Sequence, residues 1–408
     1  MLEQTILNLE FWKYASIPIV AAIVGWSTNW VAIKMLFYPV EPVGKPPYWG
    51  WQGILPSKAA KMGVITTETT LSKLGSIEEV FASMEPKRIA QQMMESIDPR
   101  VEDYVEWIML EENPTLWNAL PGLVKTIVYT IIRQRLPQAI EEMMLDIGKK
   151  IEDMVDLKQV VVTQLEKDRR LVNRIFLECG AVEFRFIIVS GLYFGFLFGL
   201  VQMGIWYFYP AWWILPLFGI IVGYATNWIA LRIIFQPLNP TRIGPFVVQG
   251  LFLKRQKEVA EIWCDIVTKE VITVRNIIAN MLYGSKSAFT QEVIKKYMRT
   301  VVDQVVGIAK PVVQLTVGIQ EYLKLQESAT QKAIFITPPA LEDPAFNKER
   351  AEVVKDLIRE RMEALSPQEF QNLLRPAFQE DEMKLILLGA ALGFIAGMAQ
   401  LFLVFGGL

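Results

Sequence analysis

The chain has 408 residues, 52% of them hydrophobic, and its 41 basic and 43 acidic residues give a net charge of −2. It contains no histidine and only two cysteines, Cys179 and Cys264, which argues against histidine-activated nucleophiles, histidine proton relays and ordinary zinc sites. We therefore predict a protein that is not an enzyme and has no cofactor, no metal ion and no nucleic-acid partner. Both cysteines are expected to be packed free thiols.

Three stretches of the chain contain no Asp, Glu, Lys or Arg: residues 14–33, 186–231 and 385–408. One membrane span needs about 20 apolar residues, and two spans with a tight turn need roughly 45. The lengths therefore predict four transmembrane helices. The expected order is an interfacial leader (1–14), a first span (15–37), a first insert (38–185), a second span (186–208), a hinge (209–213), a third span (214–235), a second insert (236–384) and a fourth span (385–406).

The leader before the first span differs from a cleavable signal peptide, because it is acidic where a signal peptide is basic. Leu2, Ile6 and Leu9 would share one face of a helix. We expect the leader to lie along the outer membrane interface.

The sequence repeats itself at a spacing of 198 residues. Residues 17–40 read IPIVAAIVGWSTNWVAIKMLFYPV and residues 215–238 read LPLFGIIVGYATNWIALRIIFQPL. Each half also closes with a glycine-ridged apolar segment: Gly191, Gly195 and Gly199 in the first half, and Gly389, Gly393 and Gly397 in the second. The pattern predicts an all-α integral membrane protein of two tandem parallel repeats, because two spans per repeat give both halves the same orientation.

The basic residues near the span ends lie mostly on the insert side, beginning with Lys34 and Arg232, whereas the other side has Lys13. The positive-inside rule then predicts cytoplasmic inserts, with the termini and the hinge outside. The expected location is a bacterial inner membrane or a plastid-type membrane.

The inserts are predicted to be helical throughout, because their apolar residues recur in steps of three and four. Such a stripe usually packs against a neighbouring helix and less often binds lipid. Ser366 and Glu369 form a predicted capping box, and the proline-containing stretch 326–347 is expected to interrupt the helices. The stripes are Leu136, Ile140, Met144, Ile147, Ile151 and Met154 in the first insert, and Val267, Val271, Val274, Ile278 and Met281 in the second.

Each first span of a repeat contains the motif Thr-Asn-Trp, which places Thr28 and Asn29, and then Thr226 and Asn227, among apolar residues. Polar side chains at this depth need partners. One interpretation is that the two asparagines join helices at the repeat interface, in the simplest case by bonding each other. The alternative is a substrate or ion site at the midplane. The six ridge glycines are predicted to allow close helix packing.

A segment rich in proline and aromatic or aliphatic residues follows each Thr-Asn-Trp span and ends in cations. This composition is typical of chain lying in the headgroup layer. A specific site for an anionic lipid or a partner is the sharper alternative. Its expected residues are Lys58, Lys61, Lys254, Arg255 and Lys257.

The strings GWSTNWVAIKMLFYP, GWQGILPSKAAKMG, GYATNWIALRIIFQP, QGLFLKRQKEVAE and GAALGFIAGMAQLF resemble the bacterial membrane family called domain of unknown function 445. The resemblance covers about a third of the chain, in the spans and their flanks. It implies an integral membrane protein with a helical cytoplasmic region, and it brings no established activity.

Two classes of function follow from these patterns. The first is a non-enzymatic membrane organiser, lipid-handling protein or assembly scaffold, whose partners are membrane lipids and either further copies of the chain or another membrane protein. The second is an oligomeric transporter or channel, because four spans enclose little space in a monomer.

Overall fold

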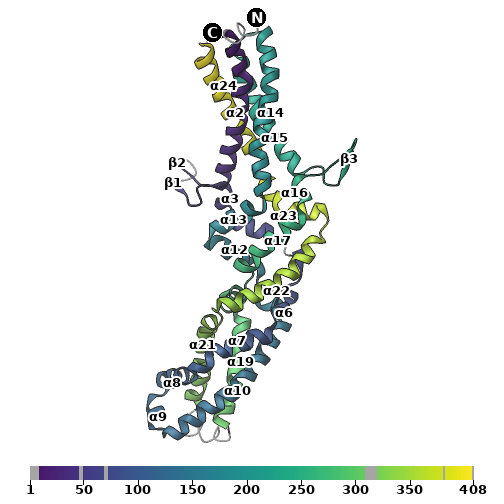
Figure 1. Cartoon of the computed structure of the whole chain (residues 1–408). Coiled ribbons are helices and arrows are strands. Elements are labelled where there is room, and N and C mark those ends of the chain that lie inside the picture. Colours follow the sequence, from purple (N-terminus) through teal and green to yellow (C-terminus); the bar gives the residue numbers. More distant parts are fainter. Residues whose placement is uncertain (1–8, 46–48, 69–71, 308–318, 380–381, 407–408) are drawn as a thin grey trace. The chain divides into compact units, whose positions relative to one another are not determined.

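The computed structural model describes residues 9–45, 49–68, 72–307, 319–379 and 382–406, so most of the predicted leader lies outside the described residues. The chain divides into two compact units, each built from segments of both sequence halves (Figure 1). Unit 1 comprises Met1–Thr70, Leu165–Trp263 and Met362–Leu408, and unit 2 comprises Leu71–Gln164 and Cys264–Arg361.

Unit 1 contains four helices that are long and apolar enough to cross a membrane: α2 (Leu9–Phe37), α14 (Ala181–Phe208), α15 (Ile214–Phe235) and α24 (Glu382–Phe405). Helix α2 packs on α14 and α15 packs on α24, while α14 also contacts α15 and α2 contacts α24. The expectation of an all-α protein with four candidate spans is confirmed.

Between 33% and 50% of the residues in the apolar part of each span are buried, so much of the apolar surface stays exposed. Phe196 on α14 and Phe402 on α24, for example, are exposed. The hinge between α14 and α15 exposes Tyr209 and Trp212, as interfacial aromatic residues do. Beside the hinge, buried Trp206 packs with Ile17, Ile214, Leu215 and Leu401.

The remaining described helices of unit 1 are α3 (Ile54–Ser57), α4 (Ala59–Thr66), α13 (Arg169–Cys179), α16 (Leu251–Lys254), most of α17 (Gln256–Ile266) and α23 (Pro367–Gln379).

Two short antiparallel hairpins follow the Thr-Asn-Trp spans: β1 (Val43–Lys45) with β2 (Trp49–Trp51), and β3 (Thr241–Ile243) with β4 (Phe246–Val248). The prediction that the inserts are helical throughout is wrong here. Prolines before each hairpin prevent the span from continuing. Gly44 in β1 and Gly244 in the turn between β3 and β4 adopt positive φ angles of 79° and 62°, which glycine tolerates.

Unit 2 is a bundle in which α10 packs against α7, α8 and α19, and α21 packs against α7, α8 and α19. Its described helices are α5 (Ser72–Leu74), α6 (Ile77–Ser83), α7 (Pro86–Ile97), η2 (Asp98–Arg100), α8 (Val101–Glu112), α9 (Pro114–Ala119), α10 (Gly122–Lys149), α11 (Ile151–Met154), most of α12 (Leu157–Lys167), the π-helix η3 (Val267–Val271), α18 (Val274–Tyr283), α19 (Ser287–Val306), α21 (Ile319–Ala340) and most of α22 (Pro344–Glu363).

The predicted interruption at 326–347 is wrong, because α21 continues to Ala340 and only a short turn precedes α22. Pro338 and Pro339 lie in the last turn of α21, so the N–H donors that they lack weaken only the end of the helix, which stops at Ala340. Asp343 caps α22 by accepting bonds from the backbone N–H groups of Ala345 and Phe346, at 2.7 and 2.9 Å.

Two smaller predictions are confirmed. The hydroxyl of Ser366 accepts a bond from the backbone N–H of Glu369, and Glu369 accepts one from the backbone N–H of Ser366, as a capping box requires. Cys179 and Cys264 are both buried and neither forms a disulfide.

Candidate functional site

Unit 2 contains an apolar cavity of about 180 Å³ that is open on one side and is lined by residues of α7, α8, α10, α19 and α21. Its wall is almost entirely aliphatic. The lining residues are Met93, Ile97, Val101, Tyr104, Val105, Ile108, Met109, Val128, Ile132, Leu136, Ile140, Met143, Ile294, Met298, Val301, Val302, Val305, Val306, Leu325, Ala329, Lys332, Ala333, Ile336 and Thr337.

The helical spacing of the sequence explains how this wall forms. Leu325, Ala329 and Ala333 recur at four-residue steps on α21, so they lie on one face of the helix. The small alanines leave room that a leucine would fill. Along the predicted stripe of the first insert, Ile147 is buried by packing, whereas Leu136 lines the cavity. A single apolar stripe therefore serves both helix packing and the cavity wall.

Lys332 brings a charge to the cavity wall. Its ammonium nitrogen lies 3.8 Å from the ring centroid of Trp107 and 2.5 Å from a carboxylate oxygen of Glu111. The side chain of Lys332 is only 15% exposed, whereas that of Glu111 is 50% exposed. The hydroxyl of Thr337 donates to the carbonyl of Ala333 at 2.8 Å, so it adds little polarity to the wall.

Two exposed aromatic residues lie next to this lysine. Trp107 from α8 and Phe335 from α21 contact edge to face, with ring centroids 5.8 Å apart. They are 40% and 62% exposed. Exposed aromatic residues that adjoin an apolar cavity are a feature of interaction sites.

Tyr129 follows the lining residue Val128 on α10. Its hydroxyl donates to the carboxylate of Glu106 at 3.2 Å. Burial, together with the negative charges of Glu106 and Glu102, raises the pKa of Tyr129 to about 12. The phenol therefore stays protonated at neutral pH and ties α10 to α8 beside the cavity.

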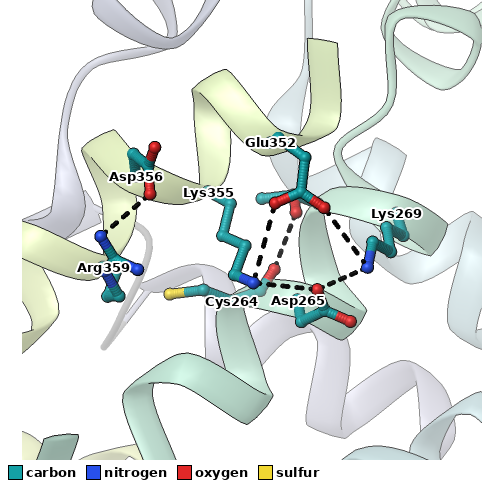
Figure 2. A network of polar contacts seen from close by, with 8 residues as sticks. Cys264, Asp265, Lys269, Glu352, Lys355, Asp356 and Arg359 are labelled. Atoms are coloured by element: carbon teal, nitrogen blue, oxygen red, sulfur yellow. Dashed lines mark hydrogen bonds and ion pairs between the residues drawn. The ribbon is translucent and has the colours of Figure 1, made fainter. Parts of the chain in front are cut away.

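A network of four charged side chains joins η3 and the end of α17 to α22 in unit 2 (Figure 2). Lys355 lies 3.1 Å from Asp265 and 3.8 Å from Glu352, and Lys269 lies 2.5 Å from Asp265 and 3.6 Å from Glu352. Burial opposes the charge on Asp265, but hydrogen bonds from Lys269 and Lys355 outweigh it and lower the pKa of this carboxyl. The two cations balance the two carboxylates, so we interpret the network as structural.

The threonine and asparagine side chains of the two Thr-Asn-Trp motifs donate to backbone carbonyls. Asn29 donates to the carbonyl of Ile187 at 2.6 Å, and Asn227 donates to the carbonyl of Leu385 at 3.0 Å. The hypothesis that the two asparagines bond each other is therefore wrong, since each side-chain nitrogen joins the two spans of its own half. Thr28 and Thr226 donate within their own helices, to the carbonyls of Gly25 and Val222.

The six ridge glycines are buried where paired spans approach each other. A Cβ atom on Gly191 would lie 2.6 Å from the side-chain nitrogen of Asn29, and one on Gly397 would lie 2.8 Å from the Cα of Pro216. Any side chain at these positions would force the helices apart. The six are Gly191, Gly195, Gly199, Gly389, Gly393 and Gly397.

The cations proposed for lipid headgroups differ in their surroundings. Lys61, Lys254 and Lys257 are exposed and Lys58 is half-buried. Arg255 lies 2.6 Å from buried Glu183 and 2.7 Å from Glu258, and these carboxylates raise the pKa of Arg255. A headgroup phosphate at Arg255 would have to displace one of them.

Sequence reasoning missed Lys332, Trp107 and the Asp265 network. One signal was present, because Lys332 adjoins Ala329, Ala333 and Ile336 within an otherwise apolar helical stripe. Within the network, Asp265 and Lys269 are four residues apart and Glu352 and Lys355 are three apart, as in ordinary helical ion pairs. Lys355 and Asp265 are 90 residues apart, so no local pattern links one pair to the other.

The comparisons with known proteins found two distant relatives. A UPF0754 membrane protein of Microcystis aeruginosa is 30% identical over 106 residues, which is 25% of this chain and 24% of that protein. A UPF0754 membrane protein of Synechococcus sp. is 22% identical over 143 residues, or 33% of this chain and 32% of that protein. The matches thus span only a quarter to a third of the relatives' length.

No family model and no solved structure matches the chain. The relatives agree with the coarse expectation of an uncharacterised membrane family, but they do not show the particular family that the motifs resemble. Together with the four apolar helices, they identify the chain as an all-α integral membrane protein.

Proposed function

We propose that this is a lipid-handling membrane protein, in which the bundle of unit 2 holds an acyl chain in the cavity lined by α7, α8, α10, α19 and α21. The observation that carries the proposal is the aliphatic wall of this cavity. Water finds few hydrogen-bond partners on this wall, whereas an alkyl chain bound there buries apolar surface.

The membrane spans support the same proposal. An acyl chain is dilute in water and abundant in a bilayer, so a protein that handles it benefits from being anchored to that bilayer. The chain has no histidine and two cysteines, and such a role requires neither residue type. Reversible binding of an acyl chain requires only a cavity of suitable shape and an entrance to it, which agrees with a non-enzymatic function.

The proposal is tested by photo-crosslinking. The full chain in phosphatidylcholine nanodiscs is irradiated with a neutral fatty alcohol that carries a diazirine on its chain, and labelled peptides are identified by mass spectrometry. We expect labelling of α10, α19 and α21 at cavity-lining residues. Ala333→Trp fills the cavity and should lower this labelling about tenfold.

The matched control is Gln331→Trp, which adds the same ring to the exposed side of α21. It should leave labelling unchanged. Circular dichroism verifies that both variants keep their helices. Equal labelling of the cavity peptides in Ala333→Trp and Gln331→Trp, or labelling confined to the spans of unit 1, contradicts the proposal.

We infer that the two sequence halves are parallel structural repeats. The support is a set of matching hydrogen bonds at the spacing of 198 residues. Besides the asparagine pair, Asn173 donates to the carbonyl of Phe37 at 2.6 Å, and the equivalent Gln371 donates to the carbonyl of Phe235 at 3.3 Å. With the basic residues beside the spans, this arrangement favours inserts on the cytoplasmic side and termini outside.

The transporter alternative rested on Asn29 and Asn227. Both side chains are bonded to carbonyls of neighbouring spans, which favours a role in helix association. We therefore base the proposed function on the cavity of unit 2.

A further inference from the structure

The cavity wall contains one feature that an ordinary apolar core lacks. Among the described residues that line it, Lys332 alone carries a charge. Its side chain is only 15% exposed, and an ammonium group so placed needs a permanent negative partner. At present that partner is the carboxylate of Glu111, at 2.5 Å.

The two members of this pair are held very differently. Lys332 is fixed by the cavity wall and by the ring of Trp107, whose centroid lies 3.8 Å from the ammonium nitrogen. A cation over an indole face gains further attraction from the ring. Glu111 is half exposed and lies outside the set of lining residues. Its carboxylate can rotate into water at little cost.

This asymmetry permits an exchange of anions at Lys332. We propose that the ligand of the cavity is an amphiphile with one alkyl chain and an anionic head, a carboxylate or a phosphate monoester, which binds Lys332 in place of Glu111. The inference rests on the proposed function and adds the class of head group to it. The ammonium stays paired before and after the exchange, so no uncompensated charge is buried.

The chemistry of the site discriminates between head groups. An anionic head forms a charge-assisted hydrogen bond with Lys332, and the released carboxylate of Glu111 is then hydrated by solvent. A neutral ester must leave the Lys332–Glu111 pair in place and gains only chain burial. A quaternary ammonium head is repelled by Lys332, although Trp107 could accept it in the absence of the lysine.

The test uses the full chain in phosphatidylcholine nanodiscs with the neutral photoreactive fatty alcohol as tracer. Its labelling of the cavity is competed with palmitic acid, hexadecyl phosphate and methyl palmitate, which share a chain length. We expect the two anions to compete about tenfold better than the ester. A preference for only one of them identifies the head as carboxylate or phosphate.

Two variants test whether the preference for anionic head groups arises from Lys332 and Glu111. Lys332→Met keeps an unbranched apolar side chain on the wall and should make acid, phosphate and ester compete equally. Glu111→Gln removes the resident anion and should strengthen competition by the anions, while the ester is unaffected. Lys295→Met is the control, because Lys295 pairs with Glu327 on the same two helices, α19 and α21, at 3.0 Å but does not line the cavity. It should retain the wild-type preference.

The outcomes separate the two proposals. Failure of the neutral tracer to label the cavity contradicts the proposed function itself. Two results would refute the anionic head group while leaving the binding of an alkyl chain in place. In the first, the tracer labels the cavity but the ester competes as well as the acid and the phosphate. In the second, Lys332→Met still prefers the acid and the phosphate to the ester.

Discussion

The guanidinium of Arg255 lies 2.6 Å from the carboxylate of Glu183, and only 3% of that acidic side chain is exposed. Glu183 begins α14 in the first half of the sequence, and Arg255 follows α16 in the second. The pair thus joins the two halves within unit 1, where a buried carboxylate has a strong need for its cation.

Removing the positive charge of Arg255 should therefore destabilise the protein. We expect Arg255→Met to lower the free energy of unfolding by about 3 to 5 kcal/mol, because Glu183 remains buried without its charge partner. The double variant Glu183→Gln/Arg255→Met should lose less than Arg255→Met alone. Denaturant titration followed by tryptophan fluorescence measures both. Arg169→Met is the control, since Arg169 pairs with exposed Glu41 at 3.6 Å and should cost less than about 1 kcal/mol. If Glu183→Gln/Arg255→Met is as unstable as Arg255→Met, the unpaired charge of Glu183 is not the cause of the loss.

The ridge glycines should tolerate no side chain. Gly191→Ala places a methyl group against Asn29 and should destabilise the spans by about 1 to 3 kcal/mol. Gly204→Ala on the same helix meets no atom within 4 Å, so it should be neutral or slightly stabilising through helix propensity. Thermal unfolding in detergent compares the two variants. Similar melting temperatures would mean that the helices do not approach so closely.

The asparagines of the spans should act independently. Asn29 and Asn227 have different carbonyl partners, so Asn29→Leu and Asn227→Leu should each cost about 0.5 to 2 kcal/mol. Their losses should add in the double variant to within about 0.5 kcal/mol. Unfolding of all four proteins of the cycle in detergent gives the coupling energy. A larger coupling would indicate that the two side chains share a partner.

The charge network of unit 2 predicts a pH dependence. Because bonding to Lys269 and Lys355 holds the pKa of Asp265 below its ordinary value of 3.8, its contribution to stability is present above that pH and is lost as the pH falls through the folded-state pKa. At neutral pH, Asp265→Asn should cost about 1 to 3 kcal/mol.

The difference between wild type and Asp265→Asn should shrink toward zero as the pH falls below about 4. The control is Asp356→Asn in the exposed pair with Arg359 (Figure 2), which should cost less than about 1 kcal/mol at any pH. Urea unfolding at a series of pH values tests this. A pH-independent loss in Asp265→Asn would refute the charge assignment.

The proposed topology is tested by labelling from outside intact cells. A cysteine at Trp212, which is exposed in the hinge, should react with a membrane-impermeant maleimide, whereas cysteines at Glu141 and Lys348 should react only after lysis. Cys179 and Cys264 are buried, so the unmodified protein provides the background. Labelling of Glu141→Cys in intact cells, with Trp212→Cys protected, would reverse the orientation.

The membrane helices were predictable because an apolar run of about 20 residues without charge matches the thickness of a bilayer and is rare in water-soluble domains. The hairpins were not, since three-residue strands such as Val43–Lys45 are too short to show a period of two. Pro338 and Pro339 were misread for a related reason. Their effect depends on whether they fall inside a helix or in its last turn, and the sequence does not mark where α21 ends.

The cavity lay beyond sequence analysis for a physical reason. A stripe such as Leu136 and Ile140 shows that one helix face avoids water, but not whether its neighbours fill the space beside it. That depends on side chains from α19 and α21, more than 150 residues away. A separation of 90 residues likewise hid the pairing of Lys355 with Asp265.

The interleaving of the two units has a consequence for synthesis. Leu71–Gln164 leaves the ribosome about 100 residues before Cys264, which at 5 to 20 residues per second is a wait of roughly 5 to 20 s. During that wait α7, α8 and α10 have made their half of the cavity wall, while α19 and α21 do not yet exist. A nascent chain at this stage displays an open aliphatic surface, which stays uncovered by its own partner helices until α19 and α21 have been synthesised.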